Sequence, residues 1–392
     1  MIDVLVAGHA CVDIIPRILP GMSGPGWLVP GRLTEAGEAM LTPGGAVSNT
    51  GLALHKLGVD VRLVARVGDD IVGDLLRRII ALTDPRLTES LVVAPGEFGS
   101  YTIVISPPGV DRCFLTGPGS NDTFGPEDVS EELLGATRIF HLGYPPLLRR
   151  MYLDHGQEMV ELYRKAKRHG ATTSLDLAMP DPAQPSGQAD WREVLAHTLP
   201  YVDIFVPSIE ELLFMLDRAR FDALEQQARG AALLGFASAE MISSLAKEAL
   251  SLGAQIVMIK LGHRGIYLRT GASESDWGRG APADLDTWRS RELWAPAFDV
   301  EVAGTVGAGD AAVAGFLTAI LRGQGPEGAI RSAAAVGACN VEATDATSGL
   351  RSWEQTQARL AAPWPQKDPA IAAPGWRQDA EQGLWRGPLD RG

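Results

Sequence analysis

The chain has 392 residues, of which 45% are apolar and 21% charged. This length suits two domains, or one large α/β domain with an insertion, and the apolar content excludes disorder for most of the chain. Acidic residues outnumber basic ones by 48 to 35, and the formal net charge of −13 disfavours nucleic acid as the main partner, because its phosphate backbone would be repelled.

Short β-branched runs alternate with helical patterns along the chain, which indicates a parallel sheet with crossover helices. Helices that end next to a glycine fit this alternation. We therefore predict an α/β sandwich, with strands at 3–7, 61–67, 138–142, 172–176, 204–206 and 255–260, and with helices at 48–57, 159–169 and 238–252.

Two segments interrupt the alternation. Residues 14–43 contain many Gly and Pro residues, and residues 98–116 have the pattern of two paired strands, 101–106 and 113–116, around a turn at 107–111. We expect the two segments to form a small β-sheet inserted beside the main domain, and to meet in space as one lid.

Two further segments lie outside the alternating strands and helices. Residues 216–235 are charged and rich in alanine, which is typical of a helical insertion at the surface. The tail, 363–392, is rich in Pro, Gly and charge but includes Trp364, Trp376 and Trp385. Because exposed tryptophans are costly, we expect this tail to dock onto the body or onto a partner subunit.

The N-terminus has no basic segment ahead of its first apolar run, and no apolar run approaches the roughly 18–20 residues that cross a bilayer. The sequence thus predicts no secretory signal, no membrane partner and a cytoplasmic location. Three widely spaced cysteines, without a CxxC pair, are typical of reduced thiols rather than of disulfides or a zinc site.

The segment GTVGAGD, from Gly304 to Asp310, precedes an almost wholly apolar stretch at 311–321. The free amides of a helix N-terminus and its positive dipole end favour an anion such as a phosphate in transfer. Asp310 could accept the proton of a substrate hydroxyl as that oxygen attacks phosphorus, or it could simply cap the helix. The same glycines fit a dinucleotide-binding pattern, but a helical stretch at 329–342 follows where that pattern needs a strand.

A second glycine segment, Gly44-Gly45, leads through Asn49 into a helix that ends at Leu57-Gly58. The two glycines let a ligand approach the backbone, and the Asn49 amide offers a donor and an acceptor that suit sugar hydroxyls. Taken alone, the segment could also be an ordinary helix entry.

At these places the chain resembles the PfkB/ribokinase family of carbohydrate kinases, over about residues 1–350. The resemblance implies a ribokinase-like three-layer sandwich in one domain, 1–362, with a mostly parallel central sheet, helices on both faces and the lid strands inserted at about 14–43 and 98–116. Five ordered motifs carry it: Gly8 with Asp13; Gly44, Gly45, Asn49 and Leu57-Gly58; Val67 to Gly73; Lys260-Leu261-Gly262 with Gly265; and Thr305 to Asp310.

The resemblance also implies roles for single residues. Asp310 would be the catalytic base, and the amides of Gly307, Ala308 and Gly309 would hold the transferring phosphoryl group. Asp13, Gly44, Gly45 and Asn49 would bind the acceptor hydroxyls, to which we add Asn121, which follows the lid. Lys260, Gly262, Gly265 and Thr305 would line the nucleotide site. The lid would close over the sugar and exclude water, and it could join two subunits as a homodimer.

The chain departs from the family pattern at two positions. Ser208 stands in place of the asparagine of Asn-x-x-Glu, whereas Glu211 is present and would organise water around the Mg²⁺ that nucleotide phosphates require. Ser208 and Glu211 also have the spacing of a capping box, which is the alternative interpretation. Gly304 replaces an aspartate that in relatives lies beside a monovalent-cation site, which puts activation by potassium in doubt.

Together these patterns predict a Mg²⁺- and ATP-dependent kinase that phosphorylates a hydroxyl of a sugar or sugar acid. A nucleoside kinase of the same fold is the near alternative, and it would need an aromatic surface near Asp13 and Asn49. A catalytically silent sugar-binding or regulatory protein also stays open, because of Ser208 and Gly304. A dinucleotide-dependent oxidoreductase is the third alternative.

Overall fold

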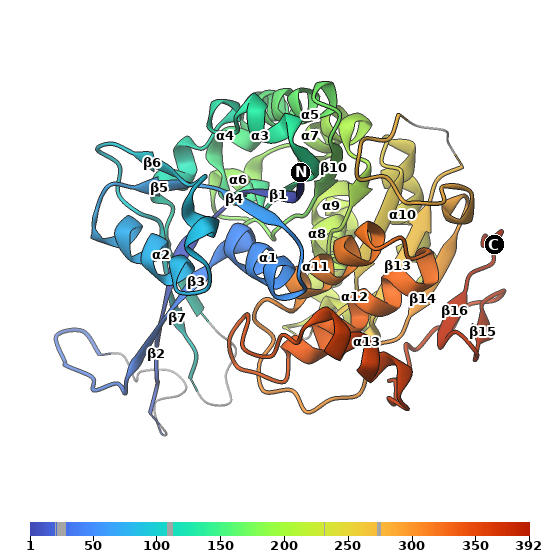
Figure 1. The fold of residues 1–392 in the computed structure, drawn as a ribbon. Coiled ribbons are helices and arrows are strands. Elements are labelled where there is room, and N and C mark those ends of the chain that lie inside the picture. The colour runs from blue at the N-terminus through green and yellow to red at the C-terminus, as the bar shows by residue number, and fades with distance from the viewer. Residues whose placement is uncertain (20, 22–28, 108–112, 231, 273–275) are drawn as a thin grey trace.

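A central sheet of ten strands organises the computed structural model, which describes residues 1–19, 21, 29–107, 113–230, 232–272 and 276–392 (Figure 1). Six neighbouring strands, β4-β1-β9-β10-β11-β12, run parallel, and β13, β14, β16 and β15 extend the sheet antiparallel. The strands are β1 (Ile2–Gly8), β4 (Val61–Val64), β9 (Thr137–Gly143), β10 (Thr172–Leu175), β11 (Ile204–Phe205), β12 (Ile256–Lys260), β13 (Ile266–Thr270), β14 (Glu292–Ala295), β15 (Arg377–Asp379) and β16 (Leu384–Arg386).

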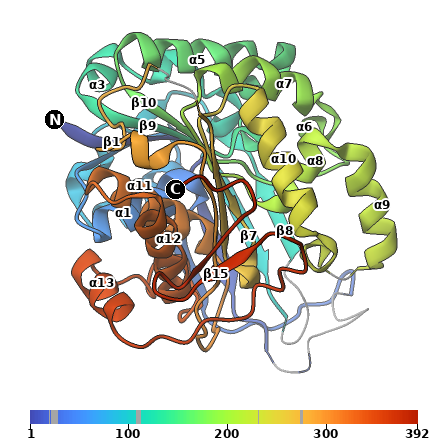
Figure 2. The ribbon, with the colours of Figure 1, turned by 90° about the vertical axis from the view of Figure 1, so that its right-hand side faces the viewer.

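Helices cover both faces of this sheet, because its central strands are apolar on both sides. In β1, Val4 and Val6 face one core while Leu5 and Ala7 face the other, as the alternation of a strand requires. Figure 2 shows the sheet between α11 and α12 on one side and α7, α8 and α10 on the other. The predicted α/β sandwich with a mostly parallel sheet is confirmed.

The first core is covered by α1 (Gly45–Lys56), α2 (Ile71–Ala81), α11 (Ala308–Leu321), α12 (Pro326–Asn340) and α13 (Trp353–Ala361). The second is covered by α3 (Glu131–Gly135), α4 (Arg149–Tyr152), α5 (Gln157–Arg168), α7 (Trp191–Thr198), α8 (Ile209–Leu216), α9 (Arg218–Ala228) and α10 (Ala239–Ser251), with the short α6 (Pro185–Gln188) before α7. No helix in the described part of the chain is both long and apolar enough to span a bilayer.

The small separate sheet that the sequence predicts is present, and Figure 1 shows it projecting from the body. Its order is β3-β2-β7-β8, formed by β2 (Cys11–Pro16), β3 (Ala39–Gly44), β7 (Tyr101–Ile105) and β8 (Cys113–Gly117). The parallel pairing of β2 with β7 brings the two interrupting segments together. Residues 108–111 of the expected turn, and residue 231 of the expected helical insertion, lie outside the described residues.

The predicted strand 61–67 is instead two strands in two sheets. β4 ends at Val64, and β5 (Arg66–Gly68) pairs with β6 (Val92–Ala94) in a separate two-stranded sheet. The Arg66 guanidinium forms ion pairs with Glu97 at 3.1 Å and with Asp128 at 2.9 Å. These partners are distant in the sequence and lie outside the central sheet, so the β-branched run at 61–67 alone could not indicate where the strand divides.

The C-terminal tail lies on the body of its own chain. The hairpin of β15 and β16 joins the central sheet through the pairing of β16 with β14. The Trp376 ring packs against the rings of Trp294 and Tyr267, with centroids 5.7 and 6.1 Å apart. The tail therefore adds two antiparallel strands to one edge of the central sheet.

Candidate active site

Asp310 lies at the centre of the candidate site, in the first turn of α11, and is 2% exposed. Its carboxylate accepts hydrogen bonds from Asn49 Nδ2 at 3.1 Å and from Thr50 Oγ1 at 3.2 Å, both on α1. α11 begins at Ala308, three residues before the predicted start, because Gly307 serves as its N-cap in the left-handed conformation with φ of 69°. No side chain caps this helix end. The Ala308 amide makes a long hydrogen bond of 3.4 Å to the carbonyl of Thr305, and the helix end still presents its first-turn amides to a ligand.

Tyr144, which the sequence did not point to, also contacts this carboxylate. Its hydroxyl lies 2.9 and 2.8 Å from the two oxygens of Asp310 and donates its proton there. Tyr144 follows β9 with φ of 61°, a left-handed conformation that is unusual for a bulky residue and that clusters at functional sites. The geometry thus turns the phenol toward the proposed base.

The surroundings of Asp310 act on its pKa in two directions. Burial is the largest effect and raises the pKa of Asp310 above its ordinary value, while the Lys260 charge and the hydrogen bonds from Tyr144, Asn49 and Thr50 offset part of that rise. Each of these hydrogen bonds stabilises the ionised form. The raised pKa makes the carboxylate a stronger proton acceptor than a free aspartate, and the lysine and the three donors limit the rise.

The residues expected at the acceptor converge beside Asp310. A Cβ on Gly44 would overlap the carboxylate of Asp13, and one on Gly45, whose φ is +84°, would lie against His9. Burial raises the pKa of Asp13 to about 6, and it lowers the pKa of His9 to about 4, so His9 is neutral near pH 7. The two glycines are what let Asp13 and His9 approach the start of α1.

Two buried acceptor atoms in this region have no hydrogen-bond partner within the described ranges, Oδ1 of Asn49 and Nδ1 of His9. An unpaired buried polar atom costs free energy unless a ligand or water satisfies it. Both atoms can accept a hydrogen bond, the Nδ1 atom as a neutral imidazole nitrogen. The arrangement therefore suits a ligand with several hydroxyl groups.

The structure does not bring Asn121 to the acceptor. Its side-chain Nδ2 donates to the carbonyl of Ala10 at 3.0 Å, and its Oδ1 accepts from the amide of Ala10 at 3.2 Å. Both ends of the amide are thus occupied by the loop between β1 and β2. Asn121 fixes the backbone beside His9 instead of pointing to a ligand.

The residues expected at the nucleotide line one cavity of about 320 Å³. Lys260, Gly262, Gly265 and Thr305 all belong to it, together with Ala308 and Gly309 of the glycine segment. The remaining walls are largely apolar and come from the loop after β14 and from α12, including Phe298, Val300, Val302, Ala333, Ala334 and Val341. A cavity with apolar walls and a phosphate-binding helix end fits a nucleotide.

Glycine is required at two of these turns. Gly265 has φ of +98°, and a Cβ there would overlap the carbonyl of Ala295. Gly307 has φ of +69°, and a Cβ would lie 2.6 Å from that of Ala346. Any other residue would therefore displace the backbone that shapes the cavity.

Lys260 connects the nucleotide cavity to a buried group of carboxylates. Its Nζ lies 2.5 Å from Oδ1 of Asp176, which follows β10. Burial raises the pKa of Asp176 and the Lys260 charge opposes that rise, while Glu211 and Asp310 interact with the same lysine. The Lys260 side chain passes so close to Gly309 that a Cβ there would lie 3.4 Å from its Cδ. Its charge is therefore held at the start of α11.

Glu211 lies in the capping box that the spacing suggests. The amide of Ser208 donates to Oε2 of Glu211 at 2.6 Å, and the amide of Glu211 donates to Oγ of Ser208 at 3.3 Å. Glu211 still belongs to the site, because the Glu211 carboxylate interacts electrostatically with Lys260, Asp176 and Tyr144. Oδ2 of Asp176 is buried and has no hydrogen-bond partner in the part of the chain that is described.

These carboxylates fit a Mg²⁺ ion only as part of its ligand shell. Three or more metal-binding side chains do not gather at any point of the described ranges, as a closed protein site would require. Mg²⁺ that accompanies a nucleotide takes one or two carboxylates and completes its shell with phosphates and water. Asp176 and Glu211 are suited to that role.

The loop around Gly304 leaves no room for the aspartate of the family pattern. A Cβ on Gly304 would lie 2.9 Å from both the carbonyl oxygen of Ala343 and the Cα of Thr344. A larger side chain would push the loop at 343–344 away from the glycine segment. A cation site built on an aspartate here could not form in this loop conformation.

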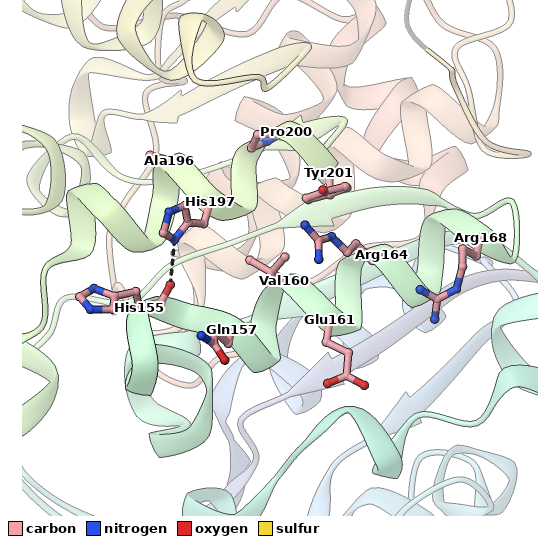
Figure 3. Close-up of a pocket in the computed structure, with 10 residues that line it drawn as sticks. All are labelled: His155, Gln157, Val160, Glu161, Arg164, Arg168, Ala196, His197, Pro200 and Tyr201. Atoms are coloured by element: carbon pink, nitrogen blue, oxygen red, sulfur yellow. Dashed lines mark hydrogen bonds between the residues drawn. The ribbon is translucent and has the colours of Figure 1, made fainter.

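A larger surface cavity, of about 730 Å³, lies away from these residues along α5 and α7 (Figure 3). Its lining includes His155, Arg164, His197 and Tyr201. None of the predicted site residues belongs to it, and in the structure they gather instead at the carboxyl ends of the parallel strands. That edge is where open α/β sheets bind ligands, so the candidate site is assigned there.

Tyr144, Thr50 and Asp176 are the site residues that sequence reasoning missed. Tyr144 and Asp176 come directly after the observed strands β9 and β10 and close to the ends of the predicted strands 138–142 and 172–176. Both could therefore have been found from the rule that ligands bind at the carboxyl ends of parallel strands. Thr50 lies one residue beyond Asn49, inside the expected helix, and no sequence signal distinguished it.

Comparisons with known proteins show the family and the fold of the chain. The family model described as "pfkB family carbohydrate kinase" matches residues 1–353. An ATP-dependent ribose-1-phosphate kinase from Halopiger xanaduensis is 26% identical over 344 residues, covering 86% of this chain and 91% of that protein. A 2-dehydro-3-deoxygluconokinase from Bacillus subtilis is 24% identical over 330 residues, covering 81% and 86%.

Solved structures of the same fold are similar over almost the whole chain. Arabidopsis thaliana ribokinase complexed with ribose and ATP has a TM-score of 0.66 at 22% identity, covering 93% of this chain and 100% of that one. Xylella fastidiosa fructokinase with bound ATP has a TM-score of 0.67 at 20% identity, covering 92% and 98%. The fold is therefore ribokinase-like. The helix α12, which directly follows α11, also disagrees with a dinucleotide-binding βαβ unit.

Proposed function

The chain belongs to the pfkB family of carbohydrate kinases, and from this premise we propose that it transfers the γ-phosphoryl group of ATP to a hydroxyl of a sugar or sugar acid. Asp310 is the catalytic base in this proposal. The observation that carries it is the position of the Asp310 carboxylate, which is hydrogen-bonded to Asn49 on the acceptor side and lies one residue from Gly309 of the nucleotide cavity.

The reaction follows from these contacts. The acceptor hydroxyl replaces one of the hydrogen-bond donors at Asp310 and gives its proton to the carboxylate as its oxygen bonds to phosphorus. The amides of Gly307, Ala308 and Gly309, together with the Lys260 ammonium, stabilise charge on the phosphoryl group. ADP leaves as the bond between the γ-phosphorus and the bridging oxygen breaks.

Acceptor binding is assigned to the polar atoms beside Asp310. The ionised Asp13 carboxylate, Oδ1 of Asn49 and Nδ1 of His9 each accept a hydrogen bond from a hydroxyl, and the backbone at Gly44 and Gly45 permits close approach. The small sheet serves as the lid that excludes water, which would otherwise take the phosphoryl group. Relatives named as ribose-1-phosphate kinase and 2-dehydro-3-deoxygluconokinase support a sugar or sugar acid as the acceptor class.

Mg²⁺ is the proposed cofactor, with Glu211 holding it through water and Asp176 beside it. When bound, it neutralises charge on the β- and γ-phosphates. Three carboxylates, those of Asp176, Glu211 and Asp310, surround the single Lys260 charge. This excess of negative charge supports the need for a cation when a polyphosphate enters.

The test is ADP release across a panel of sugars, sugar phosphates, sugar acids and nucleosides, with Asp310→Asn as the matched variant. Asp310→Asn should lower kcat by about a thousandfold or more, because it removes the proton acceptor and keeps the side-chain shape. Near wild-type turnover in this variant would refute the assignment of the base.

The panel also separates the alternatives. A sugar that binds without ADP release from any acceptor would favour the silent binding protein. A preference for nucleosides would favour the nucleoside kinase. The substrate with the highest kcat/KM names the acceptor class.

A further inference from the structure

We propose that the tail after α13 forms part of the nucleotide site, and that Lys367 is a nucleotide-binding residue. The inference rests on the proposed function, because it takes the 320 Å³ cavity as the ATP site. The family model ends at residue 353, so this segment lies beyond the part that the chain shares with the family. Lys367 nevertheless lines the cavity together with Gly309 and Thr305.

Backbone pairing holds the tail against the cavity wall. The amide of Lys367 donates to the carbonyl of Ala297 at 2.8 Å, and the amide of Asp299 donates to the carbonyl of Pro365 at 2.8 Å. These bonds flank an antiparallel bridge between Phe298 and Gln366. The tail is thus paired through a single β-bridge with the segment that carries Phe298 and leads to Val300 of the wall.

A stack of side chains fixes the same wall from the side of the tail. The Trp364 ring lies on the Phe298 ring, with centroids 4.2 Å apart and planes inclined by 26°. The Arg359 guanidinium covers the Trp364 ring at 3.8 Å from its centroid. Phe298 lines the cavity while Trp364 does not, so Trp364 positions the wall without touching the ligand.

Lys367 brings positive charge to an otherwise apolar part of the cavity. Its side chain is 36% exposed, and its Nζ lies 4.0 Å from Oδ1 of Asp299. Lys260, the other lysine of this lining, is buried against Asp176. The Lys367 ammonium keeps more freedom to donate to a phosphate or to an acceptor atom of the base or ribose, which are all features of one nucleotide.

The experiment compares Lys367→Ala with Lys247→Ala, which removes the same charge from α10 on the far side of the sheet. Binding of the non-hydrolysable analogue AMP-PNP is measured by calorimetry without acceptor, and KM for ATP is measured at saturating acceptor. We expect Lys367→Ala to weaken both about fivefold to tenfold, as for the loss of one partly exposed charged hydrogen bond. Its kcat and its KM for the acceptor should stay within about twofold, and Lys247→Ala should match the wild type throughout.

A second variant, Trp364→Leu, tests the wall. It should also raise KM for ATP with little change in KM for the acceptor, because it releases Phe298 and leaves the acceptor residues in place. Equal AMP-PNP affinity in the wild type and in Lys367→Ala would overturn the inference. A wild type that binds AMP-PNP but phosphorylates no acceptor would instead refute the proposed function, and the binding comparison would still decide the role of Lys367.

Discussion

At the scale of single residues, the hydrogen bonds to Asp310 decide how well it can act as a base. Its carboxylate is shared by donors from α1 and from the end of β9, namely Asn49, Thr50 and Tyr144. An incoming hydroxyl must take the place of one of these donors. The donor that moves away most easily therefore decides whether the hydroxyl can reach the Asp310 carboxylate. Asn49 and Thr50 are fixed within a helix, whereas Tyr144 sits on a loop, so the phenol is the donor that can yield.

Tyr144→Phe removes this donor and keeps the aromatic ring. Without the phenol the ionised carboxylate of the free enzyme is less stabilised, so the pKa of Asp310 should rise and the acid limb of the kcat/KM profile for the acceptor should move to higher pH by about one unit. Activity below neutral pH falls, while at alkaline pH it approaches that of the wild type. The measurement is kcat/KM for the acceptor against pH, which reports the free enzyme, where the phenol still contacts Asp310.

Tyr163→Phe is the matched control for this change. Tyr163 is fully buried while Tyr144 is partly exposed, and the Tyr163 hydroxyl donates to the carbonyl of Ser174 at 2.9 Å instead of to a carboxylate. Its loss should lower stability without moving the acid limb. An unshifted profile in Tyr144→Phe would show that the phenol does not act on Asp310.

Asp13 should make acceptor binding depend on pH. Burial raises its pKa to about 6, and a hydroxyl donates well only to the ionised carboxylate. The neighbouring His9, with a pKa of about 4, is already neutral in this range, and the pKa of the Cys11 thiol is raised. As the pH falls through about 6, kcat/KM for the acceptor should therefore fall about tenfold per unit.

Asp13→Asn tests this assignment. The amide does not titrate, so acceptor KM should be high and Asp13's contribution to the acid limb should disappear. KM for ATP should be little affected, because Asp13 lies outside the nucleotide cavity. An acid limb of kcat/KM that is identical in the variant would assign the titration to another group.

At the scale of elements, site residues could be predicted best from the sequence where a local motif lies next to a helix. The glycines before α1 and α11 place Asn49 and Asp310 at helix starts, and these two side chains meet at 3.1 Å. Tyr144 follows a strand with no motif around it, so its role depends on a contact across 166 residues. The antiparallel strands β13 to β16 were missed because short strands beyond the parallel core carry a weak pattern.

An ion pair attaches the tail to the body, and its contribution to the free energy of unfolding can be measured. Asp390 accepts from Nε of Arg291 at 2.8 Å, and their side chains are 1% and 4% exposed. Asp390→Ala leaves a buried guanidinium with Glu327 as its main remaining partner, which should cost about 3 kcal/mol of unfolding free energy. Urea unfolding monitored by tryptophan fluorescence checks this value.

Asp379→Ala serves as the comparison, because it breaks a pair with Arg386 in the same tail that is only partly buried. Such a pair is worth at most about 1 kcal/mol. If both variants unfolded at the same urea concentration as the wild type, the tail would contribute nothing to the stability of the body.

At the scale of the whole molecule, an acidic chain handles a polyanion through local features. In the proposed function, the net charge of −13 is offset at the site by helix amides, by Lys260 and by Lys367, and the small sheet is the lid over the acceptor. In the small sheet Asp13 lies in a polar row with Thr42, Thr102 and Thr116. The next row, on the opposite face, is apolar and consists of Leu41, Ile14, Ile103 and Leu115.

The apolar row supports the homodimer through the small sheet, which we propose as the state in solution. Leu41 and Leu115 are 45% and 57% exposed on the two outer strands, and a two-fold axis would bring this face against its copy. Light scattering after gel filtration should give twice the monomer mass.

Leu41→Asp combined with Leu115→Asp should give the monomer, because the dimer would bury opposed carboxylates. The double variant should also raise KM for the acceptor by loosening the lid. Leu82→Asp, at an 86% exposed leucine after α2, should stay dimeric, and a monomeric wild type would contradict the proposal.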